Sequence, residues 1–231
     1  MSSTADTGTR HAPLSSALAT IFRGKLCDMV LRNRSAMTFD KDQVIYDVGD
    51  GNHSFFFLRS GFVKVGTITK DGRELIYDVR KGGDVVGELC ASDQPRRDRA
   101  VALEQTEVIA VPLDEVLEIV QKNRELLRQL VQVFCDSLSD AYDQLNSVAF
   151  SDTVHRLVSV LVRLGNQLGR RSGQGTEIST YLTQEEISQM VAVRRERVST
   201  AMNFLRERGL VDYSRRGHLV LDLKALENYG D

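Results

Sequence analysis

The spacing of the apolar residues changes once along this 231-residue chain, and that change limits what the chain can fold into. Between residues 37 and 112 the apolar residues form short β-type runs separated by turns, and from residue 127 to residue 148 they recur in alternating steps of four and three. Strands have a side-chain period of two and helices one of 3.6. The pattern therefore predicts an α+β fold, with a β-rich front part, a helical back part and one core in each.

The front part has the pattern of an antiparallel barrel or sandwich. Glycine-containing pairs such as Ser60-Gly61, Asp71-Gly72 and Gly82-Gly83 separate its runs, and such pairs provide the backbone conformations that tight turns need. The predicted strands cover residues 44–46, 55–58, 62–65, 75–77, 85–86 and 107–111.

A long helix follows, whose apolar positions keep alternating steps of four and three over three heptads. Such a seam is typical of a coiled coil, so we expect this helix to pack against its twin in a homodimer. The alternative is a long helix that lies on its own barrel. The predicted dimer seam consists of Leu127, Val131, Phe134, Leu138, Ala141, Leu145 and Val148.

A helix-turn-helix is predicted near the C-terminal end. Thr183 and Glu186 form a capping box, in which each residue's side chain accepts a hydrogen bond from the other's backbone amide. A second helix then carries one stripe of side chains that can contact base edges. These predicted base-reading residues are Arg195, Glu196, Ser199, Thr200 and Asn203.

Further polar residues surround this stripe and are predicted to contact DNA phosphates. They are Thr183, Arg194, Arg197, Arg206, Arg208, Arg215 and Arg216, the last two at the tip of a two-stranded wing. From residue 153 onward there are twelve Lys or Arg against nine Asp or Glu, whereas the rest of the chain carries an excess of acidic residues. A solvated polar face is the plainer interpretation of any single helix. The capping box, the arginines and the basic wing together favour double-stranded DNA as the partner.

Other classes of function find little support in the sequence. Cys27, Cys90 and Cys135 have neither metal-ligand nor disulfide spacing, so we expect no iron-sulfur cluster and a reducing, cytoplasmic location. Oxidation of Cys90 could report on redox state, but a small buried thiol is the plainer interpretation. We expect no membrane span, no metal site and no enzyme, because no catalytic motif is present. The competing hypothesis is a regulatory subunit that binds a protein partner instead of DNA.

Three stretches resemble the CRP/FNR (cyclic AMP receptor protein) family of bacterial transcription regulators. Residues 61–74 resemble the family's barrel strands, residues 83–89 its ligand cradle and residues 182–205 its helix-turn-helix. The resemblance implies a cyclic-nucleotide-binding-like β-roll (jelly-roll) barrel, a long dimerisation helix and a winged helix-turn-helix. The domains expected from it are a flexible tail over residues 1–20, an effector-sensing β-roll over 21–121, the dimerisation helix over 122–150 and the DNA-binding domain over 151–231.

The resemblance also implies ligand contacts in the β-roll. In relatives that bind cyclic AMP, a glutamate accepts a ribose hydroxyl and an arginine grips the phosphate; here Glu88 and Arg96 fill these places, with Arg97 next to Arg96. An arginine fork favours an anionic effector, such as a cyclic nucleotide or cyclic dinucleotide. Another anion, no ligand, or a Glu88 that braces the barrel through an arginine are the alternatives. The expected contacts are Gly87, Glu88, Leu89, Arg96, Arg97, Ala141 and Tyr142.

The implied mechanism is a change in helix packing that the joint at residues 150–152 passes to the DNA-binding domain. The operator should be near-palindromic, and because Arg194 and Thr200 depart from the residues usual in the family, its half-site should differ from the family's standard one. Residues 169–175 are expected to form an exposed loop, which could contact RNA polymerase.

Overall fold

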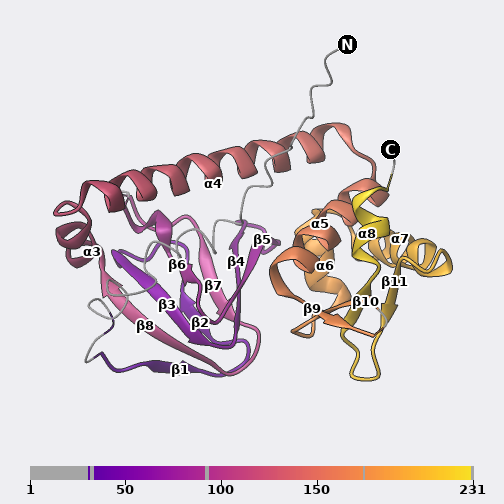
Figure 1. The fold of residues 1–231 in the computed structure, drawn as a ribbon, viewed down its shortest axis with the longest axis horizontal. Helices are drawn as coiled ribbons and strands as arrows, with labels where there is room; N and C mark the ends of the chain where they lie inside the picture. The colour runs from indigo at the N-terminus through magenta and orange to yellow at the C-terminus, as the bar shows by residue number, and fades with distance from the viewer. Residues whose placement is uncertain (1–30, 32–33, 92–93, 174, 230–231) are drawn as a thin grey trace, which may run out of the picture.

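The fold was determined as a computed structural model, which describes residues 31, 34–91, 94–173 and 175–229. A β-domain and a smaller C-terminal domain lie side by side, and the long helix α4 (Arg124–Phe150) runs across both (Figure 1). The expected tail over residues 1–20 lies outside the described residues. The α+β architecture predicted from the sequence is confirmed.

The β-domain consists of two antiparallel four-stranded sheets. One has the order β1-β8-β3-β6 and the other β2-β7-β4-β5. Their bounds are β1 Met37–Phe39, β2 Val44–Tyr46, β3 Ser54–Ser60, β4 Phe62–Ile68, β5 Glu74–Lys81, β6 Val85–Val86, β7 Arg99–Ala102 and β8 Thr106–Pro112. The sequence pattern missed β1 and β7. Both are short, and β7 follows a charged stretch and contains two alanines, so neither has a strong β signal.

Strand β3 shows why one of the predicted runs is continuously apolar. Phe56 and Leu58 lie in the cluster inside the barrel, whereas Phe55 and Phe57 lie in a second cluster on the other face of the sheet. That second cluster includes Val116 and Val120 of α3 (Leu113–Val120). The strand is therefore buried on both faces, and alternation with polar residues is lost.

The C-terminal domain contains a larger sheet than expected. It is composed of α5 (Thr153–Leu168), β9 (Gly169–Ser172), β10 (Gly175–Ile178), α6 (Gln184–Val191), α7 (Arg195–Glu207), β11 (Val211–Tyr213), β12 (Leu219–Leu221) and α8 (Leu223–Glu227). The prediction of a loop over residues 169–175 is wrong, because β9 and β10 pair with each other there. They extend the two-stranded wing to a sheet with the order β11-β12-β10-β9. Residues 169–175 are rich in glycine and arginine, a composition that is typical of a loop. A Cβ at Gly169 would lie 2.2 Å from the Gly165 carbonyl oxygen, so glycine is needed where the strand leaves α5.

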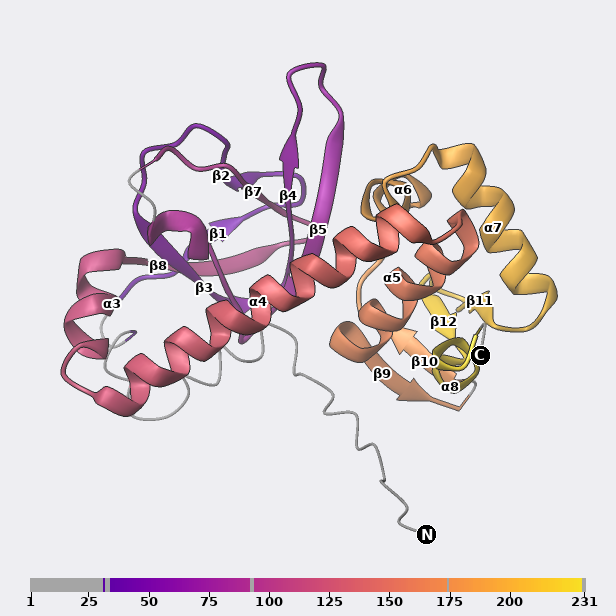
Figure 2. The same cartoon turned by 90° about the horizontal axis from the view of Figure 1, so that it is seen from above.

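The β-domain has buried clusters of its own, and the core of the C-terminal domain also extends into it. Ile76 and Val79 of β5 and Leu103 belong to the same buried cluster as residues of the C-terminal domain such as Leu161 and Ile187. Helix α6 and strand β5 lie side by side, as Figures 1 and 2 show. The β-domain therefore contributes directly to holding the C-terminal domain in place.

Candidate DNA-binding surface and effector site

The helix-turn-helix begins with the predicted capping box. The Thr183 hydroxyl accepts from the Glu186 amide at 3.1 Å, and Glu186 Oε2 accepts from the Thr183 amide at 2.8 Å. Ile187, Met190 and Val191 of α6 are buried, as the spacing predicted. These contacts fix the first helix of the motif on the core.

The turn between α6 and α7 is held by a residue that the sequence did not single out. Ala192 adopts a left-handed conformation with φ 56°, which is unfavourable for a residue with a Cβ. Arg156 of α5 donates to the carbonyl oxygens of Val191 and Ala192, and so satisfies acceptors that the end of α6 leaves open. Nothing in the local spacing identifies Arg156, because its partners lie 35 residues and more along the chain.

The predicted base-reading residues lie on the outer side of α7. Arg195, Glu196, Thr200 and Asn203 are exposed, while Ser199 is half-buried and donates a hydrogen bond to Gln184. The buried face of α7 consists of Val198, Ala201, Met202 and Leu205, as predicted. In Figures 1 and 2, α7 lies at the end of the molecule farthest from the β-domain, where a DNA duplex can approach it.

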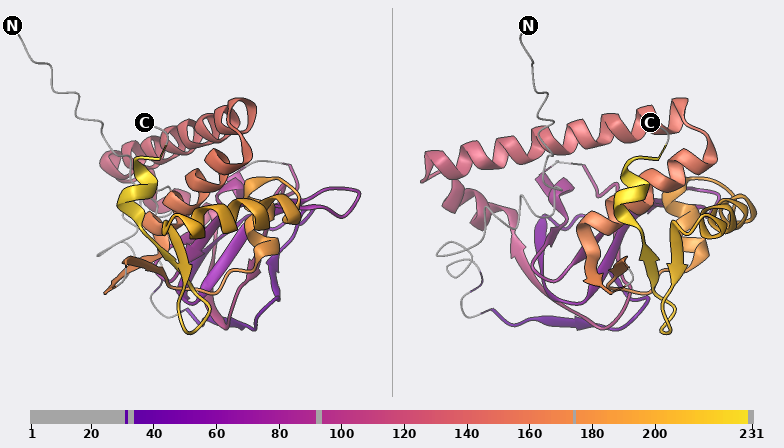
Figure 3. Two further views of the ribbon diagram at one scale, coloured as in Figure 1. Left: turned by 90° about the vertical axis from the view of Figure 1, so that its right-hand side faces the viewer. Right: turned by 45° about the vertical axis from the view of Figure 1, so that its right-hand side comes forward.

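The arginines around α7 differ in how much they are engaged within the protein. Arg194 and Arg197 are exposed beside the start of α7, and Arg215 and Arg216 are exposed in the turn between β11 and β12, which projects from the domain in both views of Figure 3. Within the described part of the chain, none of these four forms an ion pair. They are therefore available to phosphates.

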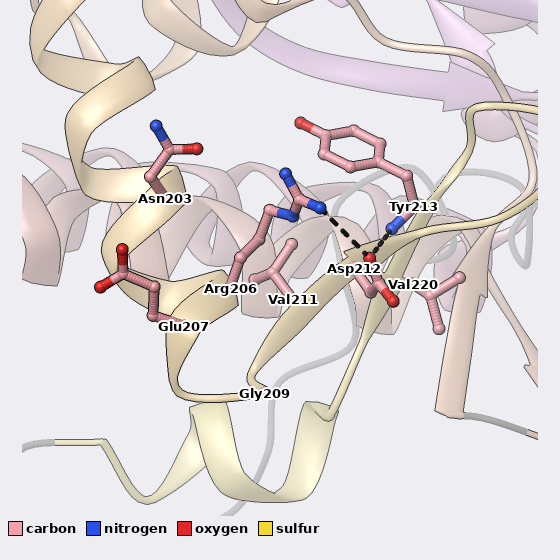
Figure 4. Close-up of a pocket in the computed structure, with 8 residues that line it drawn as sticks. All are labelled: Asn203, Arg206, Glu207, Gly209, Val211, Asp212, Tyr213 and Val220. Atoms are coloured by element: carbon pink, nitrogen blue, oxygen red, sulfur yellow. Dashed lines mark hydrogen bonds and ion pairs between the residues drawn. The ribbon is translucent and has the colours of Figure 1, made fainter.

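Arg206 and Arg208, by contrast, have partners within the domain. Arg206 lies 3.8 Å from Asp212 and its guanidinium carbon is 5.5 Å from the centre of the Tyr213 ring. Arg208 stacks on Phe204 with a separation of 3.5 Å. Arg206 also lines a pocket of about 640 Å³ between α7 and the wing, together with Asn203 (Figure 4). A phosphate contact by Arg206 would have to replace its pairing with Asp212.

The predicted ligand cradle contains a buried ion pair. Glu88, at the start of the short 3₁₀ helix η1 (Glu88–Ala91), lies 3.2 Å from Nη2 of Arg80, and Nε of Arg80 lies 3.2 Å from Asp78. Burial raises the pKa of Glu88, and the charge of Arg80 partly opposes that rise. Glu88 thus has the bracing arginine that the sequence analysis kept as an alternative to a ligand. Its Oε2 atom is buried and accepts no hydrogen bond within the described structure.

Arg96 and Arg97 are not brought together as a fork. Arg97 is exposed, whereas Arg96 is 3% exposed and donates to the carbonyl oxygens of Ser54 at 2.6 Å and Gly87 at 3.3 Å. Its guanidinium also stacks on the Tyr46 ring at 4.1 Å. The Gly87 carbonyl therefore serves as a partner of Arg96, and a Cβ at Gly87 would lie 3.2 Å from the Arg96 guanidinium.

Asp98 is a buried member of the cradle that the sequence analysis missed. It is 3% exposed, and its Oδ2 accepts from the Tyr46 hydroxyl at 2.8 Å. Burial raises the pKa of Asp98, and burial followed by the charge of Asp98 raises the pKa of Tyr46. The cradle and its surroundings thus contain four carboxylates, Asp78, Asp84, Glu88 and Asp98, against two guanidiniums, Arg80 and Arg96. No motif signals Asp98, because its role depends on the pairing of β2 with β7.

The predicted dimer seam is largely open to solvent in the single chain. The exposed fractions are 48% for Leu127, 54% for Val131, 39% for Phe134, 53% for Leu138 and 64% for Leu145. Ala141 and Tyr142, expected near a ligand, are exposed too, and Leu89 of the cradle is 49% exposed. The side chain of Val148 lies outside what the structure describes.

The described ranges contain neither a cluster of metal ligands nor a helix that could span a membrane. No group of three or more His, Cys, Asp or Glu residues in them could hold a metal ion. None of the described helices has both the length and the apolar character that a membrane span requires. Cys135 is exposed on α4, whereas the side chain of Cys90 and all of Cys27 lie outside the description.

Comparison with known proteins gives matches over both domains. The cyclic nucleotide-binding domain family matches residues 36–123, and the Crp-like helix-turn-helix domain family matches residues 155–229. The chain is 26% identical over 189 residues to a CRP-like cAMP-activated global transcriptional regulator of Mycobacterium tuberculosis, an alignment that covers 81% of this chain and 84% of the relative.

Solved structures support the same fold. A CooA variant from Carboxydothermus hydrogenoformans is similar with a TM-score of 0.73 at 22% identity, covering 93% of this chain and 95% of that one. The c-di-GMP responsive regulator CLP of Xanthomonas campestris has a TM-score of 0.69 at 21% identity, covering 84% and 97%. With an effector-binding β-domain, a long helix and a Crp-like helix-turn-helix in this order, the chain belongs to the CRP/FNR family of DNA-binding transcription regulators, a family of regulators and not of enzymes.

Proposed function

We propose that this protein is a cytoplasmic homodimer that binds a near-palindromic DNA operator through two copies of α7, and that a small effector in the β-roll modulates this binding. The observation that carries the proposal is the exposed polar stripe of α7 at the outer end of a molecule whose long helix leaves an apolar seam open. Dimer symmetry then relates the two reading helices, and the operator takes on the same symmetry.

The seam of α4 supports the dimer. An apolar stripe from Leu127 to Leu145 in contact with water is unfavourable, and a second copy of α4 would bury it in a coiled coil. Helix α4 has 27 residues and so a length of roughly 40 Å, which is enough for the three heptads of the seam.

In this proposal, residues of α7 contact bases, and other residues on and around it contact phosphates. Arg195 would donate two hydrogen bonds to guanine, Glu196 would accept from cytosine, and Ser199, Thr200 and Asn203 would contact neighbouring bases. Thr183, Arg194, Arg197, Arg206, Arg215 and Arg216 would contact phosphates, which sets affinity and its salt dependence.

The effector is proposed to bind in the cradle around Glu88. The relatives include a regulator named as cAMP-activated and one named as c-di-GMP responsive, which supports a nucleotide. An anionic effector would have to draw Arg80 or Arg96 away from its present partners, since Glu88 and Asp98 add negative charge to the same region. Its expected contacts are Gly87, Glu88, Leu89, Arg96, Arg97, Ala141 and Tyr142.

Selection of bound duplexes from a random-sequence pool tests the proposed operator. We expect the wild-type protein to enrich a motif with two inverted half-sites whose centres are about 34 Å apart, one helical turn of DNA. A pool without any enriched motif after several rounds would exclude sequence-specific binding. A single, asymmetric half-site would exclude the dimeric arrangement.

Substitution of Arg195 tests base reading on that selected duplex. Arg195→Ala should lower the preference for the operator over a scrambled duplex by about 1–3 kcal/mol, because a bidentate guanine contact is lost. The competition is measured by fluorescence anisotropy at one fixed salt concentration. Arg73→Ala removes an exposed arginine of the turn between β4 and β5 and should leave the preference unchanged. An unchanged preference in Arg195→Ala would remove Arg195 from the reading role.

Substitution in the seam tests the dimer. Leu138→Glu should raise the dissociation constant of the dimer by more than about a hundredfold, because a coiled coil would bury unpaired like charges at the centre of the seam. Sedimentation velocity over a concentration series measures the shift. Leu117→Glu on α3 is the matched control, since Leu117 is 44% exposed and Leu138 is 53% exposed. A wild-type protein that sediments as a monomer at all concentrations would contradict the proposal.

Calorimetric titration tests the effector. We expect heat of binding from at least one of cyclic AMP, cyclic GMP and cyclic di-GMP, and the same ligand should change the affinity for the selected duplex. Glu88→Gln should weaken binding of that ligand, since a neutral amide is a poorer acceptor for a ribose hydroxyl than a carboxylate is. Absence of heat with all three ligands would discard the nucleotide effector, and would leave the DNA-binding function standing.

A further inference from the structure

A partly buried ion-pair cluster joins the β-domain to the first helix of the helix-turn-helix. Lys64 Nζ on β4 lies 3.2 Å from Glu74 Oε2 on β5 and 3.9 Å from Glu186 Oε1 on α6. The three side chains are only 12%, 19% and 12% exposed, in that order. Charges buried to this extent interact more strongly than surface pairs, because little water screens them.

Glu186 divides its two carboxylate oxygens between two tasks. Oε2 accepts from the amide and the hydroxyl of Thr183 in the capping box, while Oε1 faces Lys64. Lys64 therefore holds the residue that organises the start of α6. Helix α6 leads through the turn held by Arg156 into α7, so a shift of α6 would also move α7.

Two further contacts fix the same interface. Ile76 and Val79 of β5 are at most 2% exposed and share a core with Ile187 of α6. The Lys81 ammonium donates to the carbonyl oxygen of Gln167 near the end of α5. The C-terminal domain is thus attached to the β4–β5 pair by apolar contacts and by two lysines at separate points.

Residues 79–81 of β5 contact both the C-terminal domain and the cradle. Val79 and Lys81 contact the C-terminal domain, whereas the side chain of Arg80 between them pairs with Glu88. Successive side chains of a strand point to opposite faces, so β5 lies between the cradle and the helix-turn-helix. A ligand that displaced Arg80 from Glu88 would act on the strand that holds α6.

We propose that Lys64 is a positioning residue for DNA reading: it fixes α6 on the β4–β5 pair through Glu186, so that the reading surface of α7 is correctly oriented only while this contact is intact. The proposal rests on the proposed function. It adds a direct route from the cradle to the reading helix through β5, in parallel with the joint at residues 150–152. Without Lys64, Glu74 and Glu186 face each other as like charges, and their repulsion displaces α6.

The experiment uses the full-length protein, the selected operator duplex and a scrambled duplex. Lys64→Met should weaken operator binding about tenfold, a coupling of ordinary size between a remote residue and a binding site. Binding to the scrambled duplex and the dependence of operator affinity on salt should stay unchanged. A lysine that contacted a phosphate would instead lower the salt slope by about one on substitution. Lys70→Met, at an exposed position in the β4–β5 turn, is the matched control.

Two further variants separate positioning from a general loss of stability. Glu186→Gln keeps an oxygen for the capping box, since glutamine also serves at this position, but removes the charge that Lys64 pairs with. It should weaken operator binding in the same way, and Lys64→Met combined with Glu186→Gln should be less severe than the sum of the single changes. Lys64→Arg should restore operator affinity.

Operator affinity equal to that of the control in Lys64→Met, a reduced salt slope, or strictly additive effects would each overturn the proposal. Hydrogen exchange of the DNA-free protein gives a separate readout. Lys64→Met should speed exchange of amides in α6 and β5 relative to Lys70→Met, and unchanged protection there would overturn the proposal even if the wild-type protein bound no DNA. Failure of the wild type to bind any duplex would be a failure of the proposed function alone.

Discussion

The packing of β5 against α5 and α6 is the contact on which the rest of this arrangement depends. Because Ile76 and Val79 are buried in the same cluster as Leu161 and Ile187, the C-terminal domain cannot leave the β-domain without exposing apolar surface. This contact uses the inner side of the helix-turn-helix. It therefore leaves α7 on the outer side, and it makes the exposure of the proposed reading residues a consequence of how the domains pack.

The sequence predicted those elements whose signal is local. The capping box at Thr183 and Glu186, the inner face of α7 and the long helix α4 depend on spacings of three and four residues, which one helix determines by itself. Most strands of the β-domain were also predicted, because their apolar runs end at glycine turns. The predictions were wrong where the local signal for a strand is weak. Strand β7 was missed, and residues 169–175 resemble a loop although β9 and β10 form a hairpin there.

Long-range pairing could not be predicted in the cradle. Arg96 was placed at a phosphate on the basis of resemblance, but in the fold it is surrounded by the Tyr46 ring and the carbonyl oxygens of Ser54 and Gly87. Arg80 and Asp98 carry no sequence signal of their own, and they come near Glu88 only when the strands pair. An excess of carboxylates over guanidiniums then results from tertiary structure. Burial in this setting raises the pKa values of Glu88 and Asp98, and the charges of Arg80 and Arg96 oppose the rise at Glu88 and Asp98, respectively.

The arginines of α7 differ in whether they already have an ion-pair partner, and this difference affects which of them can contribute to affinity and which to specificity. Arg195 has no ion-pair partner among the described residues, so a guanine contact by it would replace only water. Arg206 near the other end is paired with Asp212 at 3.8 Å, an exposed pair that is worth at most about 1 kcal/mol. A phosphate is a stronger partner than this carboxylate at such a distance, yet the remaining charge of Asp212 would still oppose the DNA backbone. The first turns of α7 are therefore suited to strong, base-specific contacts, whereas its end by the wing is suited to weak contacts that adjust the total affinity.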